Sequence, residues 1–357
     1  MSTSALPATS LRLENLVEAV RANCRISDAR HARNMTMCTY LLEMRELYRW
    51  EHGYALDEAL PRPDVGAWLT EREAHWDAIE HAGYRPLPLG DGLVDPFAAE
   101  TVNRVLVPQG FVYGAGVGRF GKPQFFLADL EREEWRDGVR VLVAGHEHAR
   151  DIAPAPAALR ADTIYVRTAA LQRLLWERAG LWNRRGAGGA LKSALDACGF
   201  ADEPMSALKR MADAETETLI LHELGEREAG ERLSPAWERM LEGFAGRRAE
   251  LFARAARDHL ADCTVTLPAL LARDAAPSLH LWFAGLDGMR RELFPRLAGA
   301  YDAWRRGDGG GALAATAEAG AGHWRRVCDD ALALAERNGV EAERAIEALA
   351  EASATRL

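Results

Sequence analysis

The octapeptide LILHELGE, Leu219 to Glu226, places a histidine and two glutamates directly after an apolar run. At helical periodicity, Glu215, His222 and Glu226 fall on the same stripe as the apolar residues of the segment 205–231. A buried ionised carboxylate is costly unless a partner charge, hydrogen bonds or a metal ion compensate it. These three side chains therefore need a partner inside the protein.

Two later helical segments carry the same combination of histidine and acid. His259 and Asp262 continue an apolar stripe in the segment 235–263, and His280 and Asp287 lie two turns apart in the segment 277–305. Imidazole and carboxylate ligands on facing helices hold iron or manganese in helical oxidases, and they also suit zinc. The predicted metal ligands, not all of which can contact one ion, are Glu215, His222, Glu226, His259, Asp262, His280 and Asp287.

LILHELGE resembles the zinc-metallopeptidase pattern H-E-x-x-H, in which two histidines bind zinc and the glutamate between them is the base. Glu226 replaces the second histidine here, so peptidase activity is not implied. The Glu215-x6-His222 spacing is also similar to the first ligand helix of haem-oxygenase-like dimetal proteins. Their usual H-x3-D-x2-H pattern is absent, and His280-x6-Asp287 would have to serve in its place.

These patterns predict a metal-dependent helical-bundle protein that acts as an oxidase or hydrolase on a small molecule. Bound iron would support oxygen-dependent oxidation, whereas bound zinc would support hydrolysis, with Glu223 or Glu226 as the base. The alternative is a non-enzymatic binding or accessory protein with a protein partner, whose buried histidines and acids pair with arginines. Convergence of Glu215, His222, His259 and His280 within metal-ligand reach would favour the metal site. Their separation into independent pairs with arginines would reject it.

Two further motifs are weaker. The segment GVGRFGKP, Gly116 to Pro123, has the G-x-x-x-x-G-K spacing of a phosphate-binding loop, but Pro123 stands where Ser or Thr is needed. No nucleotide is therefore predicted, and Arg119 and Lys122 are expected to face water on a hairpin turn. His146 and His148 offer a second ligand pair, but an exposed loop is the preferred interpretation.

The expected fold is α+β, with a helical N-terminal domain that includes a small antiparallel β-meander, followed by an all-α helical bundle. Residues 1–155 and 156–357 are the expected domains. Helical periodicity covers residues 11–25, and Ser27 with Asp28 offers a cap for a second helix that ends near Trp50. The meander is predicted from the runs FVYGAGV, PQFFLADL and VRVLVAG, and the segment 151–162 is interpreted as the boundary.

Composition limits the classes of function. A net charge of -9 over 357 residues argues against nucleic acid and anionic membrane surfaces as partners. The N-terminal residues show no secretory signal pattern, and the five cysteines contain no C-x-x-C pair, so a reducing, cytoplasmic location is expected. Metal identity, substrate and oligomeric state do not follow from these features.

Three longer segments resemble an uncharacterised bacterial protein family with no assigned activity. They are RISDARHARNMTMCTYLLEMRELYRWEHG, GRFGKPQFFLADLE and DHLADCTVTLPALL. The resemblance covers most of the chain, but it implies no catalytic residue and no substrate.

Overall fold

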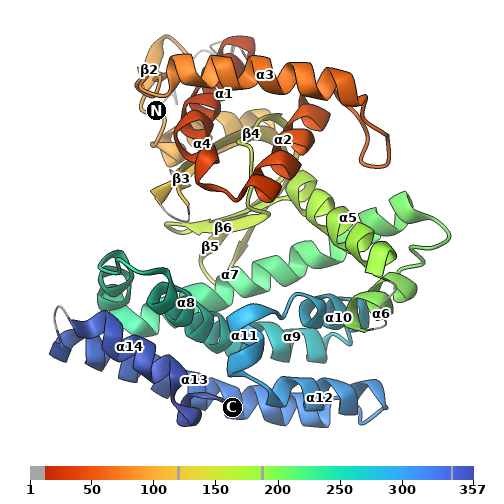
Figure 1. Cartoon of the computed structure of the whole chain (residues 1–357), viewed down its shortest axis with the longest axis vertical. Helices are drawn as coiled ribbons and strands as arrows, with labels where there is room; N and C mark the ends of the chain where they lie inside the picture. The colour runs from red at the N-terminus through yellow and green to blue at the C-terminus, as the bar shows by residue number, and fades with distance from the viewer. Residues whose placement is uncertain (1–12, 119–120, 186–188, 339–340) are drawn as a thin grey trace, which may run out of the picture. The chain divides into compact units, whose positions relative to one another are not determined.

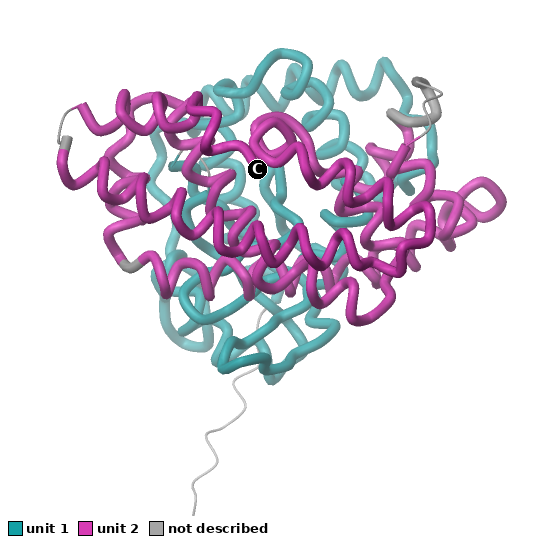
Figure 2. The backbone as a smooth tube through the Cα atoms, turned by 90° about the horizontal axis from the view of Figure 1, so that it is seen from below, with its two compact units in different colours: residues 1–174 teal, residues 175–357 magenta. Residues whose placement is uncertain are grey.

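The computed structural model describes residues 13–118, 121–185, 189–338 and 341–357. The chain divides into two compact units, residues 1–174 and residues 175–357, which Figure 2 shows in two colours. The expected division at 155 falls before two strands that pair with the sheet of the first unit. No helix in the described part of the chain has the length and apolar character needed to cross a membrane.

The first unit begins with three long helices, α1 (Leu13–His31), α2 (Met37–Glu51) and α3 (Arg62–Ile79), and adds α4 (Ala99–Leu106) (Figure 1). The expected cap at Ser27 and Asp28 is wrong, because α1 continues through both residues. The Ser27 hydroxyl donates to the carbonyl of Pro123, and Asp28 binds Lys122. Both side chains thus serve tertiary contacts, and Thr36 caps the second helix by accepting a bond from the Thr39 amide.

The second helix, α2, is apolar on two faces. Tyr40, Met44 and Leu47 are buried, whereas Met37 and Leu42 are 70% and 59% exposed. One of these faces of α2 is therefore buried in the first unit, and the other is exposed.

A five-stranded mixed sheet forms the centre of the first unit, with the order β3-β4-β5-β7-β6. Its strands are β3 (Phe111–Val117), β4 (Pro123–Arg136), β5 (Val139–Ala149), β6 (Ala157–Arg160) and β7 (Thr163–Arg167), beside a separate hairpin of β1 (Leu87–Leu89) and β2 (Gly92–Val94). The first three strands form the predicted antiparallel meander, with Asp137 and Gly138 at positive φ in the β4–β5 turn. A simple meander is nevertheless wrong, because β7 pairs in parallel with β5 and β6 extends the sheet.

Helices α1 and α4 pack against this sheet. The core that they share with β3 and β4 includes Leu16, Val20, Leu106, Tyr113 and Phe125. This packing places the polar face of α1, with Asp28 near its end, beside the strand that begins at Pro123.

The second unit is helical throughout its described residues. Its elements are α6 (Ala190–Ala197), α7 (Pro204–Glu242), α8 (Arg247–Ala261), a π-helical segment (Asp262–Thr266), α9 (Leu267–Ala272), α10 (Ala276–Ala284), α11 (Gly288–Leu293), α12 (Arg296–Arg305), α13 (Gly311–Asn338) and α14 (Ala342–Glu351). Helix α5 (Thr168–Arg185) carries the chain from the first unit into the second. Helices α8 and α13 pack together in its core, which includes Phe252, Phe294 and Trp324.

Two expected helix boundaries are wrong. Helix α7 continues through Pro235 to Glu242, because the buried side chains of Leu233 and Trp237 extend its packed face beyond the proline. The expected helix 277–305 is three helices, α10, α11 and α12, separated by breaks at Gly285–Asp287 and at Phe294–Pro295. His280 and Asp287 therefore do not lie two turns apart on one helix.

All five cysteines are free. Cys24 in the first unit and Cys263 and Cys328 in the second are buried, whereas Cys38 is exposed. Burial raises the pKa of each of the three buried thiols above its ordinary value.

Candidate metal centre

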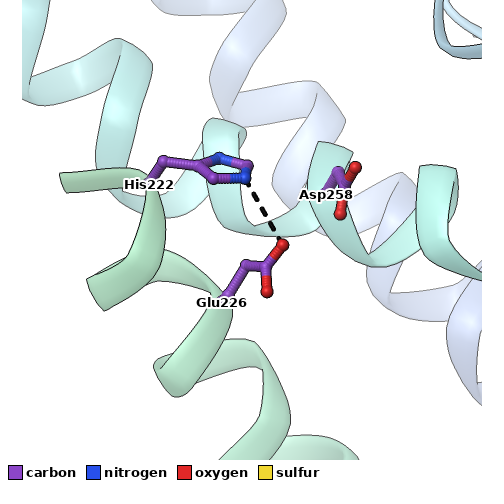
Figure 3. Close-up of side chains that lie close together, drawn as sticks. All are labelled: His222, Glu226 and Asp258. Carbon is purple, nitrogen blue, oxygen red and sulfur yellow. Dashed lines mark ion pairs between the residues drawn. The ribbon is translucent and has the colours of Figure 1, made fainter. Parts of the chain in front are cut away.

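His222 lies on α7 with hydrogen-bond partners for both ring nitrogens. Its Nδ1 is 2.9 Å from Oδ1 of Asp262, the buried first residue of the π-helical segment, and its Nε2 is 3.4 Å from Oε1 of Glu226. Glu226 follows His222 by one helical turn, so both side chains point from α7 toward α8 (Figure 3). The histidine is held between two carboxylates from different elements.

A third carboxylate, Asp258 on α8, completes a compact set of donors. His222, Glu226 and Asp258 each offer one nitrogen or oxygen atom, and these three atoms lie within 4.8 Å of one another (Figure 3). All three side chains are partly buried. One metal ion could contact all three donors after small side-chain rotations, because metal–nitrogen and metal–oxygen bonds are about 2 Å long.

Two arginines neutralise the acids of this cluster. Arg257 Nη2 lies 2.8 Å from Oε2 of Glu226, and Arg290 donates to Oδ2 of Asp262. The cluster therefore combines three carboxylates with two guanidinium groups and one imidazole. The arginines each leave one oxygen of their carboxylate facing His222.

The pKa values follow from this arrangement. Burial alone would lower the pKa of His222, but the charge of Asp262 and the hydrogen bonds to Asp262 and Glu226 raise it well above its ordinary value. Burial would raise the pKa of Glu226, but His222 and Arg257 hold it well below the usual range. Burial and the neighbouring charge of Glu226 raise the pKa of Asp258 to about 6. His222 and Arg257 thus supply the positive charge that stabilises these carboxylates.

The other predicted ligands have partners of their own. Nε2 of His259 is 2.9 Å from the carbonyl oxygen of Arg290, and its ring stacks on Trp324. Nδ1 of His280 is 2.7 Å from the hydroxyl of Tyr301. Asp287 is exposed at the start of α11. The structure thus brings together His222, Glu226 and Asp262 from the predicted set, but His259, His280 and Asp287 do not join the three-donor cluster found among the described residues.

Glu215 lies two turns before His222 on α7, about 10 Å away along the helix axis. Its Oε1 accepts a bond of 3.1 Å from the Thr218 hydroxyl, and Ser278 on α10 is a second hydrogen-bond partner. It therefore faces α10 and is not part of the cluster at His222. Burial raises the pKa of this carboxyl to about 7.

Because the pKa of Glu215 is raised, the substitution Glu215→Gln is expected to increase the free energy of unfolding by an amount that depends on pH. Ionisation of the buried carboxyl opposes folding, so stability falls as the pH rises from about 4.5, the unfolded-state value, through about 7. At pH 8 the free energy of unfolding of the variant is expected to exceed that of the native protein by about 1–2 kcal/mol. At pH 4.5 the two values are expected to be equal. Urea unfolding at both pH values measures this difference. Exposed Glu231 on the same helix is the control, and an equal gain in Glu231→Gln would contradict the explanation.

Sequence reasoning missed Asp258. The residue lies one turn before Asp262, the same spacing that joins His222 to Glu226, and this spacing was the available signal. Glu223, the predicted base, is buried and contributes to the raised pKa of Arg257, so its charge acts in the same region.

The weaker motifs also differ from expectation. His146 and His148 lie on strand β5 and not on a loop, and Nε2 of His148 is 2.7 Å from Oδ1 of Asp129. Lys122 is not solvated but buried against Asp28, because the strand after it packs on α1. Arg119 lies outside the described residues.

Comparisons with known proteins agree with the two-part organisation. Residues 15–167 match the model described as "Family of unknown function (DUF6866) N-terminal domain", and residues 172–353 match the corresponding C-terminal domain model. No curated protein and no solved structure matches the chain. The two family models together span nearly the whole sequence, and the chain belongs to the DUF6866 family of unknown function.

Proposed function

We propose that this chain is a metal-dependent protein in which His222, Glu226 and Asp258 hold one divalent transition-metal ion. The observation that carries this proposal is the approach of three donor atoms from two helices to within 4.8 Å of one another. Three protein ligands leave coordination positions open for water or a substrate, as in catalytic metal sites. The proposed centre uses a smaller set of ligands than the sequence predicts.

The surroundings of His222 support this function. A carboxylate on the second ring nitrogen of a metal-bound histidine fixes its tautomer and orientation, and Asp262 stands in that position relative to Nε2. Arg257 holds Oε2 of Glu226 and leaves Oε1 directed at the imidazole. One nitrogen and two oxygen donors suit zinc, manganese or iron.

The chemistry follows from the ion that is bound. Zinc would support hydrolysis of a small molecule, for which Glu223 is the candidate base, and iron would support oxygen-dependent oxidation. The second candidate function is a binding or accessory protein with a structural polar network. The ion pairs Arg257–Glu226 and Arg290–Asp262 favour it, because buried charges in such a network are expected to be paired.

Measurement of bound metal separates the two functions. The full chain is purified without a tag from metal-supplemented cells, and iron, manganese and zinc are determined per chain by elemental mass spectrometry. Near-stoichiometric metal is expected in the native protein. Asp258→Asn, which preserves shape but removes the charge, is expected to lower metal affinity by about 10-fold or more, and His222→Ala to abolish retention.

Asp287→Asn provides the matched control, since this exposed aspartate lies outside the cluster. Its metal content should equal that of the native protein. Absence of metal after reconstitution, or unchanged metal in Asp258→Asn, would reject the metal centre and leave the structural network as the better explanation.

A further inference from the structure

A small pocket in the first unit is lined mainly by arginines. Its volume of about 240 Å³ includes the open solvent at its mouth, and the enclosed part, about 10 Å³, has room for about one water molecule. Its charged lining residues are Arg21, Arg25, Arg72, Arg150, Asp28 and Glu51. Four guanidinium groups thus face two carboxylates around one space.

Both carboxylates of the pocket already have cationic partners. Asp28 accepts a bond of 2.8 Å from Lys122, which does not line the pocket. Glu51 binds Arg72 and also accepts a bond of 3.0 Å from the indole of Trp68. Arg72 is therefore neutralised by Glu51, and Arg25 pairs with Glu18 at 3.4 Å. This leaves Arg21 and Arg150 as the pocket arginines without an ion-pair partner among the described residues.

Arg150 is the pocket residue whose hydrogen bonding is least satisfied. It is 6% exposed, and its Nε and Nη2 atoms are buried without a hydrogen-bond partner in the part of the chain that the structure describes. A buried donor without a partner is expensive, and such groups in native proteins usually meet water or a ligand. Burial also lowers the pKa of this guanidinium, with Arg173 and Arg167 adding to the effect against the opposing charges of Glu147 and Asp151.

Two buried acids, Glu147 and Asp151, act on Arg150 through their charges, although Oε2 of Glu147 and both carboxylate oxygens of Asp151 lack a hydrogen-bond partner among the described residues. Oε1 of Glu147 accepts a bond of 2.6 Å from Arg167. Asp151 lies 3.7 Å from both Lys122 and Arg167. These acids oppose the lowering of the pKa of Arg150, but neither Nε nor Nη2 of its guanidinium donates a hydrogen bond to them within the described residues.

An indole forms one wall of the pocket and orients two of its cations. The guanidinium carbons of Arg21 and Arg150 lie 5.7 Å and 5.6 Å from the ring centre of Trp50. Nε of Arg21 donates to the carbonyl of His148, and the Trp50 indole donates to the carbonyl of Glu147. These contacts fix the aromatic ring and Arg21 before any ligand enters, which reduces the entropic cost of binding.

We propose that this pocket binds an oxyanion, the carboxylate or phosphate group of a small metabolite. Arg150 supplies the buried donors, and Arg21 supplies the adjacent positive charge at the same Trp50 ring. A guanidinium presents its donors in a planar fork that matches both groups. The enclosed space holds only about one water molecule, so the anionic group binds at the open mouth of the pocket, against the guanidinium groups, and a whole cofactor does not fit inside.

Isothermal titration tests this assignment with inorganic phosphate and with acetate. The full chain is first passed over a chelating resin, so that a bound metal ion does not supply the binding. Saturable binding of at least one probe is expected. Preference for phosphate assigns a phosphate group to the natural ligand, and preference for acetate assigns a carboxylate.

Arg150→Leu is expected to weaken binding by about 10-fold or more, because it removes charged hydrogen bonds. Arg21→Leu, which removes the adjacent positive charge, should weaken it by a smaller factor, and it keeps the proposal testable if Arg150→Leu does not fold. Exposed Arg104 on α4 is the control, whose leucine variant should bind as the native protein does. Failure of the native chain to bind either probe, or an equal loss in Arg104→Leu, would overturn the proposal, as would unchanged affinity in a folded Arg150→Leu or Arg21→Leu variant.

Discussion

Replacement of Lys122 by methionine is expected to lower the free energy of unfolding by about 3–5 kcal/mol. Lys122 Nζ lies 2.8 Å from Asp28 and 3.7 Å from Asp151, and both aspartates are buried. Methionine preserves most of the volume but leaves the two carboxylates short of one positive charge. Urea unfolding, monitored by circular dichroism, measures the loss.

Lys192→Met is the matched control, because Lys192 forms an exposed pair with Asp196, and its loss should be below about 0.5 kcal/mol. The double variant Asp28→Asn with Lys122→Met should be less destabilised than the sum of the single variants, since the second change removes the unpaired charge. Equal losses in Lys122→Met and Lys192→Met would show that the buried pair contributes no more than a surface pair.

Gly225→Ala is expected to destabilise the second unit by about 2–3 kcal/mol. A Cβ atom at this position would lie 2.7 Å from the carbonyl oxygen of Ala261, so α7 and the end of α8 would have to separate. Gly225 lies between His222 and Glu226, whereas Asp258 and Asp262 lie on the opposing element. Under the proposed function, the same separation should also weaken metal binding by His222, Glu226 and Asp258. Urea unfolding and elemental analysis measure the two effects.

Gly230→Ala on the same helix is the control, and it is expected to raise the free energy of unfolding instead of lowering it. An added Cβ there meets no atom within 4 Å, so the higher helix propensity of alanine should stabilise the protein by up to about 1 kcal/mol. If Gly225→Ala were also stabilising, the close approach of α7 to Ala261 would not be a constraint on the fold.

The candidate site was only partly predictable from the sequence. Helix periodicity identifies which face of a helix is buried, but it does not identify the element that packs against that face. It correctly placed His222 and Glu226 on the packed face of α7, and it identified Asp262 as a buried polar residue on the next element. It did not select Asp258 over His259, since the two adjacent residues point about 100° apart and their partners come from distant segments. His259 faces Trp324 on α13, a contact that no local pattern encodes.

The fold shows the same limit. Local turn chemistry predicted the β3–β4–β5 meander, whose neighbouring strands are also neighbours in sequence. The parallel pairing of β5 with β7 joins residues across the segment 150–162, and it depends on tertiary packing. The arginine pocket was missed for a related reason, since Arg21, Arg72 and Arg150 form no basic run and meet only after the chain folds.

The distribution of the thiols gives each unit its own reporter of transient opening. A thiol must be accessible and deprotonated to react with an alkylating reagent, and Cys24, Cys263 and Cys328 are neither in the native fold. Modification of Cys24 therefore requires opening of the first unit, and modification of Cys263 or Cys328 requires opening of the second. Peptide mapping after increasing times of exposure to the reagent can thus show which unit opens more readily. Exposed Cys38 is the internal standard for reagent activity.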